Sequence, residues 1–222
     1  MYQWDFSWVW TYREQLFEAL WVTIHINLVI LILGTLLGIT LGLLGKLRSS
    51  IGNFVLAAYV DFFRSLPVLV GLVWFFYCAP MFLGGMRISA YASAVIVLSL
   101  NLSAFVAEII RSGLNSVPKG IIESSRALGV SRTRTMRSIV IPIATRIIVP
   151  PLLGQYINSI KLSVLASIIS VPELLSRTTD IISQTYRPLE FYTVLAILFL
   201  ALLTPLTLAF RYLERRFSKF SF

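Results

Sequence analysis

The stretch Glu123-Ser124-Ser125-Arg126-Ala127-Leu128-Gly129, with Ile139-Val140-Ile141-Pro142 after it, is the most informative part of this chain. Its first part, Glu123–Gly129, lies inside residues 111–137, the longest polar segment of the sequence. Gly129 predicts the end of a short helix, because glycine readily adopts the left-handed conformation that follows a last helical turn. The segments on either side are apolar, so their lengths decide the fold class.

Composition points to a membrane protein. Hydrophobic residues make up 57% of the 222 residues and charged residues 13%, and the mean hydropathy is +0.83, whereas about a quarter of a soluble domain is charged. A helix needs roughly 20 apolar residues to cross a bilayer. Four windows without Asp, Glu, Lys or Arg approach or exceed that length: residues 19–45, 66–86, 88–107 and 191–210.

A fifth window, residues 138–169, is apolar but contains Arg146, Pro150-Pro151 and Lys161. The sequence therefore predicts an all-α polytopic membrane protein with about five transmembrane helices in a single domain, residues 1–222. Residues 46–65 are expected to be an amphipathic connection, in which Asp61 and Arg64 are spaced to pair across one turn. Residues 172–190 are expected to be a second connection that contains a short helix.

The net charge of +9 is explained by orientation. With the N-terminus outside, fourteen Lys and Arg residues fall on inner segments and four on outer segments, with Lys161 inside the membrane. Basic residues concentrate on the cytoplasmic side of membrane proteins. The chain is therefore expected to have its N-terminus outside and its C-terminus in the cytoplasm, and nucleic acid is not an expected partner.

No enzymatic site is encoded. The nearest imitation of a phosphate-binding loop, at Gly45-Lys46, lacks the required hydroxyl residue because Leu47 follows. The single cysteine, Cys78, forms neither an internal disulfide nor a metal cluster. The single histidine, His25, has no carboxylate near it in the sequence and is expected to bond to a neighbouring helix. We expect no catalytic residues, no metal site and no cofactor in this chain.

The opening stretch resembles the E-A-A-x-x-x-G-(nine residues)-I-x-L-P loop of the membrane subunits of bacterial ABC importers. The spacing from Gly129 to Ile139 and Pro142 matches, while serines replace the two alanines and Ile141 replaces the leucine. In that family the loop, here about residues 117–142, rests in a groove on a separate ATPase subunit. The resemblance implies an ATPase-coupling role for Glu123, Ser124, Ser125, Ala127, Leu128 and Gly129.

Other segments are similar to permeases for polar amino acids. They cover nearly the whole chain in the expected order: Phe62-Phe63-Arg64-Ser65-Leu66-Pro67, Ala104-Phe105-Val106-Ala107-Glu108-Ile109-Ile110-Arg111, Val117-Pro118-Lys119-Gly120, Lys161-Leu162-Ser163-Val164-Leu165 and Val171-Pro172-Glu173-Leu174. Within the second of these, an intrahelical Glu108–Arg111 pair is favoured over substrate contact.

The resemblance implies a type I ABC importer permease fold in the bacterial inner membrane, which translocates a polar amino acid or close analogue by alternating access. It also implies two copies of an ATP-binding subunit that hold ATP and Mg, a second permease subunit, and a solute-binding protein. Two alternatives stay open: a non-transporting membrane assembly subunit, and an ion-coupled secondary carrier. The coupling-loop spacing argues against both.

The substrate pathway is expected to include Lys161 and Ser163, with Asn101 and Ser103 as secondary contacts. A lysine within a membrane helix is costly and usually faces a cavity or a partner. The family has a polar residue where this chain has Leu162, so nothing adjacent would meet an ammonium group. We therefore expect a heterodimer whose other permease subunit supplies that contact, with a homodimer as the alternative.

Overall fold

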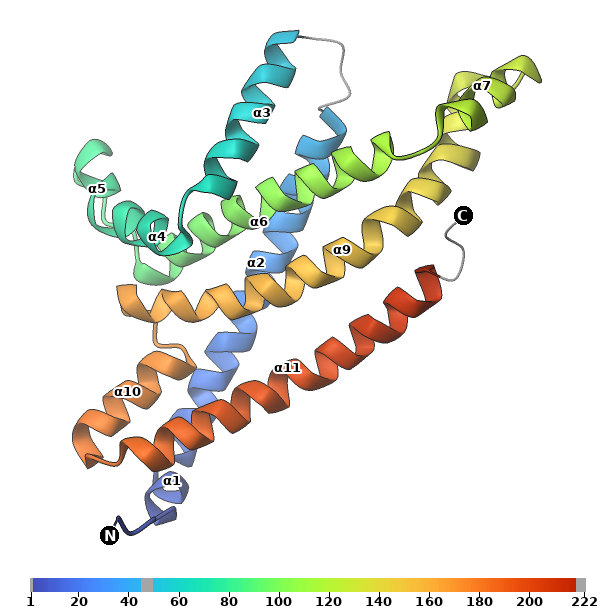
Figure 1. Cartoon of the computed structure of the whole chain (residues 1–222). Coiled ribbons are helices and arrows are strands. Elements are labelled where there is room, and N and C mark those ends of the chain that lie inside the picture. The colour runs from blue at the N-terminus through green and yellow to red at the C-terminus, as the bar shows by residue number, and fades with distance from the viewer. Residues whose placement is uncertain (1, 45–49, 219–222) are drawn as a thin grey trace.

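A computed structural model describes residues 2–44 and 50–218, which are helical apart from short connections. The elements are α1 (Ser7–Thr11), α2 (Arg13–Leu44), α3 (Ser50–Ser65), α4 (Val68–Tyr77), α5 (Ala79–Phe82), α6 (Ala90–Asn115), α7 (Lys119–Ala127), α8 (Arg132–Thr135), the π-helical segment η1 (Met136–Val140), α9 (Ile141–Leu162), the 3-10 segment η2 (Ser163–Ile169), α10 (Leu174–Thr185) and α11 (Pro188–Ser218). Figure 1 shows α7 at one end of the long helices, with α10 and the N-terminus at the other.

Within the described residues, four helical spans are long and apolar enough to cross a membrane. They are residues 13–44, 90–115, 132–169 and 188–215. A fifth crossing arises if residues 52–65 and 68–77, which meet at an angle of 100°, form one bent span. The all-α fold and the prediction of about five spans are confirmed.

The second span does not have its predicted form. A single helix was expected over residues 66–86, with residues 46–65 as a connection; instead α3 is a 16-residue helix that packs against α6, and the chain bends sharply before α4. Pro67 causes the break, because it has no N–H to donate and forces Leu66 away from helical geometry. Gly84 and Gly85, near the expected end, adopt positive φ values of 69° and 81° in a turn.

The contact between α2 and α6 is the most extensive in the molecule's described part. Gly34, Gly38 and Gly42 line one face of α2, and each meets a branched side chain of α6. A Cβ atom added at Gly38 would lie 2.4 Å from Cβ of Val106. The two backbones thus approach as closely as the absence of a side chain allows, which is the usual way for membrane helices to pack.

At the end of the molecule opposite α7, buried polar contacts hold α10 against α2. Glu173 accepts hydrogen bonds from the N–H groups of Leu175 and Ser176 and so caps α10. Burial raises the pKa of the Glu173 carboxyl, and these N–H donors act in the opposite direction. Thr23 of α2 accepts a hydrogen bond from the N–H of Leu174 at 3.0 Å. The predicted connection over residues 172–190 therefore contains a helix, and it is anchored to α2.

Gly38→Ala tests the α2–α6 contact. We expect a loss of stability of about 1–3 kcal/mol, since the added methyl group has no room beside Val106. The measurement is the melting temperature of the purified protein in detergent. Gly154→Ala on α9 is the matched control, because nothing lies within 4 Å of its added Cβ and alanine favours a helix over glycine. Equal melting temperatures for the two variants would contradict the packing argument.

Candidate functional site

Residues 119–129, which contain Glu123–Gly129, fold as a short helix closed by a tight turn. After α7, Gly129 adopts a φ of 77°. Its N–H donates to the carbonyl of Arg126 at 2.9 Å, and the N–H of Val130 donates to the carbonyl of Ser125 at 3.1 Å. These two bonds define a Schellman motif, which satisfies the last carbonyl groups of a helix and favours glycine at the left-handed position. The predicted helix end at Gly129 is confirmed.

The chain then turns back into the membrane span. Ser131 caps α8 by accepting a hydrogen bond from the N–H of Arg134. The segment η1 joins α8 to α9 without leaving helical geometry, and Pro142 lies in the first turn of α9, where it has no N–H to donate to the preceding turn. The loop is thus a direct extension of two spans, since α6 leads into α7 and α8 leads into α9.

A buried hydrogen bond ties the two short helices together. The hydroxyl oxygens of Ser125 and Thr135 lie 2.5 Å apart, and both side chains are buried. Ser125 occupies a position where the importer motif has alanine, so Thr135 accounts for this departure. No local pattern in the sequence indicates the role of Thr135, because its partner lies ten residues away across a turn.

The outer side of the loop is exposed. Glu123, Ser124 and Ala127 all face solvent, and the Leu128 side chain is 83% exposed at the tip. The inner side packs on a small apolar cluster built around Val117, Val140 and Ala144. The Leu128 side chain is therefore available for contact with a partner.

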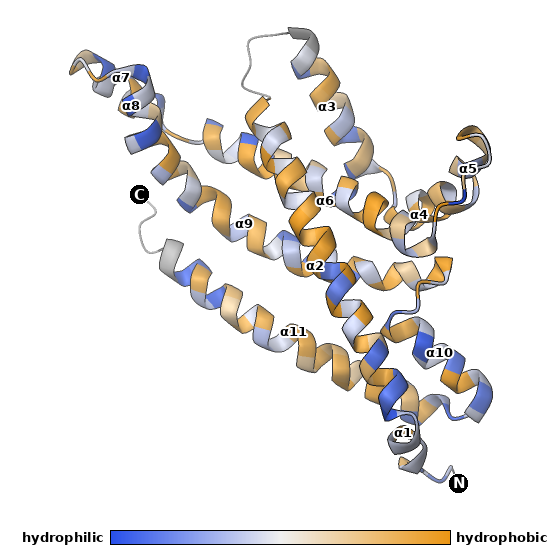
Figure 2. Cartoon of the chain, turned by 180° about the vertical axis from the view of Figure 1, so that it is seen from behind, coloured by the Kyte–Doolittle hydropathy of each residue, from blue (hydrophilic) through white to orange (hydrophobic). Residues whose placement is uncertain are grey.

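This surface is also strongly basic. Glu123 is accompanied by five exposed cations: Lys119, Arg126, Arg132, Arg134 and Arg137. None of the five forms an ion pair with a carboxylate in the described part of the chain. Figure 2 shows hydrophilic residues gathered on α7 and α8, in contrast to the apolar length of α9. A partner with an acidic surface would complement this end of the molecule.

The predicted pathway residues Asn101 and Ser103 are both buried and bonded to α3. The Asn101 amide donates to the carbonyl of Phe63 at 2.8 Å. The Ser103 hydroxyl lies 2.6 Å from the hydroxyl of Tyr59. These contacts hold α3 against α6. The predicted Glu108–Arg111 pair is present, with a separation of 2.9 Å, and His25 bonds to Tyr91 of α6 at 2.8 Å as expected.

Lys161 and Ser163 do not lie together. Ser163 is buried and accepts a hydrogen bond from the Asn27 amide at 2.9 Å. Lys161 is exposed on α9 and has no ion-pair partner among the described residues. It shares one exposed helix face with Gly154 and Asn158. Asn158 was not predicted from the sequence, although its spacing of three residues from Lys161 places both on one helix face.

The comparisons with known proteins agree with this geometry. Residues 34–219 match the family model described as binding-protein-dependent transport system inner membrane component. The chain is 33% identical to the glutamine transport system permease protein GlnP of Escherichia coli (strain K12), over 96% of this chain and 98% of that one. It is also 33% identical to the arginine transport system permease protein ArgU of Corynebacterium glutamicum, over 98% of this chain and 73% of that one.

A solved structure described as an amino acid ABC transporter with histidines matches with a TM-score of 0.89 and 30% identity. The match covers 97% of this chain and 100% of that chain. The resemblance noted from the sequence motifs is therefore confirmed over nearly the whole chain. The chain belongs to the family of binding-protein-dependent transport system inner membrane components, and it is a multi-pass permease subunit of an ABC importer.

Proposed function

We propose that this chain is one half of the translocation pathway of an importer for a polar amino acid such as glutamine, arginine or histidine. The observation that carries the proposal is the Gly129 turn, which presents an exposed Leu128 at the end of two continuous spans. The names of the relatives, which refer to glutamine, arginine and histidines, support the substrate class.

The loop over residues 117–142 transmits force from a pair of ATPase subunits, which bind ATP and Mg. Glu123, Ser124, Ala127 and Leu128 form the contact, while Ser125 and Gly129 keep its shape. When the ATPase subunits close around ATP, the loop moves with them. Because α7 follows α6 and α8 leads into α9, that movement rocks two spans and opens the substrate site to the other side of the membrane.

Substrate passes along the face of α9 that carries Lys161 and Asn158. A lysine and an amide exposed in a membrane span are costly against lipid, so this face meets a second permease subunit or the pathway. Lys161 binds the carboxylate of the amino acid. Ser163, Asn101 and Ser103 position the helices behind this face through their buried hydrogen bonds.

A solute-binding protein delivers substrate to the mouth formed near α10 and the N-terminus, which lies outside. An assembly subunit without transport activity would have no use for the coupling turn. An ion-coupled carrier would need no ATPase. Uptake by the complete transporter in proteoliposomes, measured with and without ATP and the ATPase subunit, separates the three functions.

Gly129→Val tests the coupling role. A branched side chain at a φ of 77° costs about 1–2 kcal/mol in the left-handed conformation, so the turn should be lost. We expect ATP-dependent uptake and substrate-stimulated ATP hydrolysis to collapse while the protein still inserts. Gly120→Val in α7 is the control, because nothing lies within 4 Å of its added Cβ. If substrate still stimulates ATP hydrolysis normally in the Gly129→Val transporter, the turn has no role in coupling.

Cysteine labelling tests the orientation. In a Cys78→Ser background, Ser116→Cys at the end of α6 and Ser183→Cys in α10 introduce single thiols at exposed positions. The charge asymmetry predicts that an impermeant reagent added outside labels position 183 and leaves position 116 unlabelled until the membrane is opened. The orientation is wrong if both thiols react from outside, or if only position 116 does.

The number of permease species tests the heterodimer. This half presents Lys161 for a carboxylate, and Leu162 stands where an ammonium partner is expected. A second, different permease subunit is therefore expected to supply the polar contact. Native mass spectrometry of the transporter purified from its own cells should detect two permease masses. A fully active complex that contains only this chain as permease would end the heterodimer proposal.

A further inference from the structure

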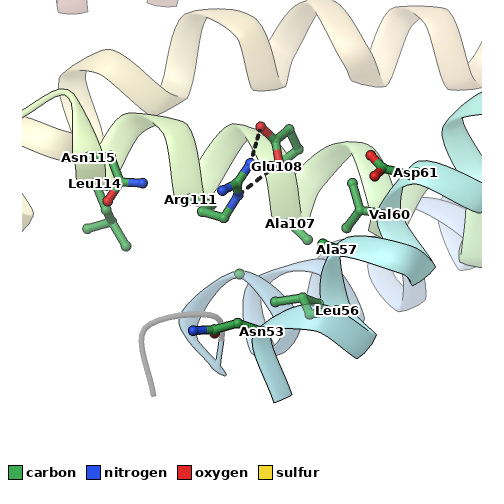
Figure 3. Close-up of a pocket in the computed structure, with 11 residues that line it drawn as sticks. Asn53, Leu56, Ala57, Val60, Asp61, Ala107, Glu108, Arg111, Leu114 and Asn115 are labelled. Atoms are coloured by element: carbon green, nitrogen blue, oxygen red, sulfur yellow. Dashed lines mark hydrogen bonds and ion pairs between the residues drawn. The ribbon is translucent and has the colours of Figure 1, made fainter. Parts of the chain in front are cut away.

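A cavity of about 270 Å³ lies between the last turn of α2, the helix α3 and the last turns of α6. Its polar wall consists of Asn53 and Asp61 from α3, and Glu108, Arg111 and Asn115 from α6. Figure 3 shows Asp61 and the Glu108–Arg111 pair on the wall of this one cavity, with the two asparagines nearer its other end. None of the roles proposed above uses it.

Only some of the charged groups that line the cavity are paired with one another. Arg111 donates through Nε to Oε2 of Glu108 at 3.0 Å and through Nη2 to Oε1 at 2.9 Å. The Nη1 group is engaged by neither bond. Asp61 has no hydrogen bond or ion pair with any described residue, although its spacing from Arg64 predicted a pair. Arg64 lies instead over the ring of Phe105, 5.5 Å from its centre.

The wall therefore offers an unpaired carboxylate and a guanidinium edge that can still donate. Together they complement a small molecule that carries both an ammonium and a carboxylate group. Leu56, Val60 and Leu114 supply apolar surface beside them. Pockets for drug-sized ligands span about 300–1,000 Å³, so this cavity suits a smaller molecule. We propose that the cavity between α3 and α6 binds the zwitterionic head group of a free amino acid.

Because the cavity lies between α3 and α6 beside the coupling loop, a bound ligand would affect how these helices move. Arg111 and Asn115 belong to the last two turns of α6, immediately before α7. Farther along, α3 is held to α6 by the Tyr59–Ser103 and Asn101–Phe63 hydrogen bonds. A ligand that bridges Asp61 and Arg111 adds a second link between the same helices, next to the coupling loop. It would fix their spacing and oppose the rocking that the loop drives.

In the proposed orientation this end faces the cytoplasm, where the imported amino acid accumulates. The cavity is thus a product-inhibition site on the permease itself. This inference rests on the proposed function, since the ligand is the transported amino acid. The two are separable by experiment, because transport into empty vesicles tests the function and inhibition by internal product tests the cavity.

The experiment uses the complete transporter in proteoliposomes that enclose ATP, with solute-binding protein and labelled L-glutamine outside. Vesicles are prepared with and without millimolar unlabelled L-glutamine inside, and initial uptake is compared. We expect internal glutamine to slow the wild type several-fold. Asp61→Asn should keep its uptake into empty vesicles and need at least about tenfold more internal glutamine for the same inhibition, because a charged hydrogen bond is lost.

Glu214→Gln is the matched control, since it removes an exposed carboxylate from the cytoplasmic end of α11, outside the cavity. It should remain inhibited like the wild type. If Asp61→Asn does not assemble, Asn53→Leu tests the same wall and should also weaken inhibition. The inference is overturned if internal glutamine leaves the uptake rate of the wild type unchanged. It is also overturned if an assembled Asp61→Asn or Asn53→Leu transporter is inhibited as fully as the wild type. Loss of uptake into empty vesicles by the wild type would instead refute the proposed function.

Discussion

The close approach of α2 and α6 is the contact on which the other elements depend. Because Gly38 has no side chain, Val106 can pack directly against the backbone of α2. This brings α6 to the centre of the molecule, and it is the most buried of the four long spans. The helices α3, α4 and α9 each pack on α6 in turn. In a membrane, where apolar side chains gain little by leaving lipid, such tight packing and buried hydrogen bonds must supply the stability.

In the proposed mechanism, α6 carries the movement of the loop to the helices packed on it. The Ser125–Thr135 hydrogen bond and the Gly129 turn make α7 and α8 one compact unit. Their apolar inner side packs on the ends of α6 and α9. The exposed Leu128 and the surrounding cations are left for a partner. In the proposed complex, basic charge at this site would accelerate the encounter with an acidic surface.

The fold class, the number of spans and the turn at Gly129 could be predicted from the sequence, because each leaves a local signal. Apolar windows mark the spans, and Gly129 marks the turn. The helix over residues 50–65 was not expected as part of this span, because Asp61 and Arg64 exclude the segment from the apolar window, which begins at Leu66. Lys161 and Ser163 were grouped as pathway residues, yet positions two apart lie on opposite faces of a helix. Burial of Asn101 and Ser103 depends on α3, whose helix was expected to be a connection.

The π-helical segment between α8 and α9 affects how the loop is aimed. A π-helical turn accommodates one residue more than an α-helical turn, and such insertions often lie at functional positions. Each residue of an α-helix turns the chain by about 100°. Without the extra residue within Met136–Val140, α8 would leave α9 rotated by about that angle, and the tip at Leu128 would point along another side of the span. The direction in which this tip faces is therefore set by a one-residue difference in helical register.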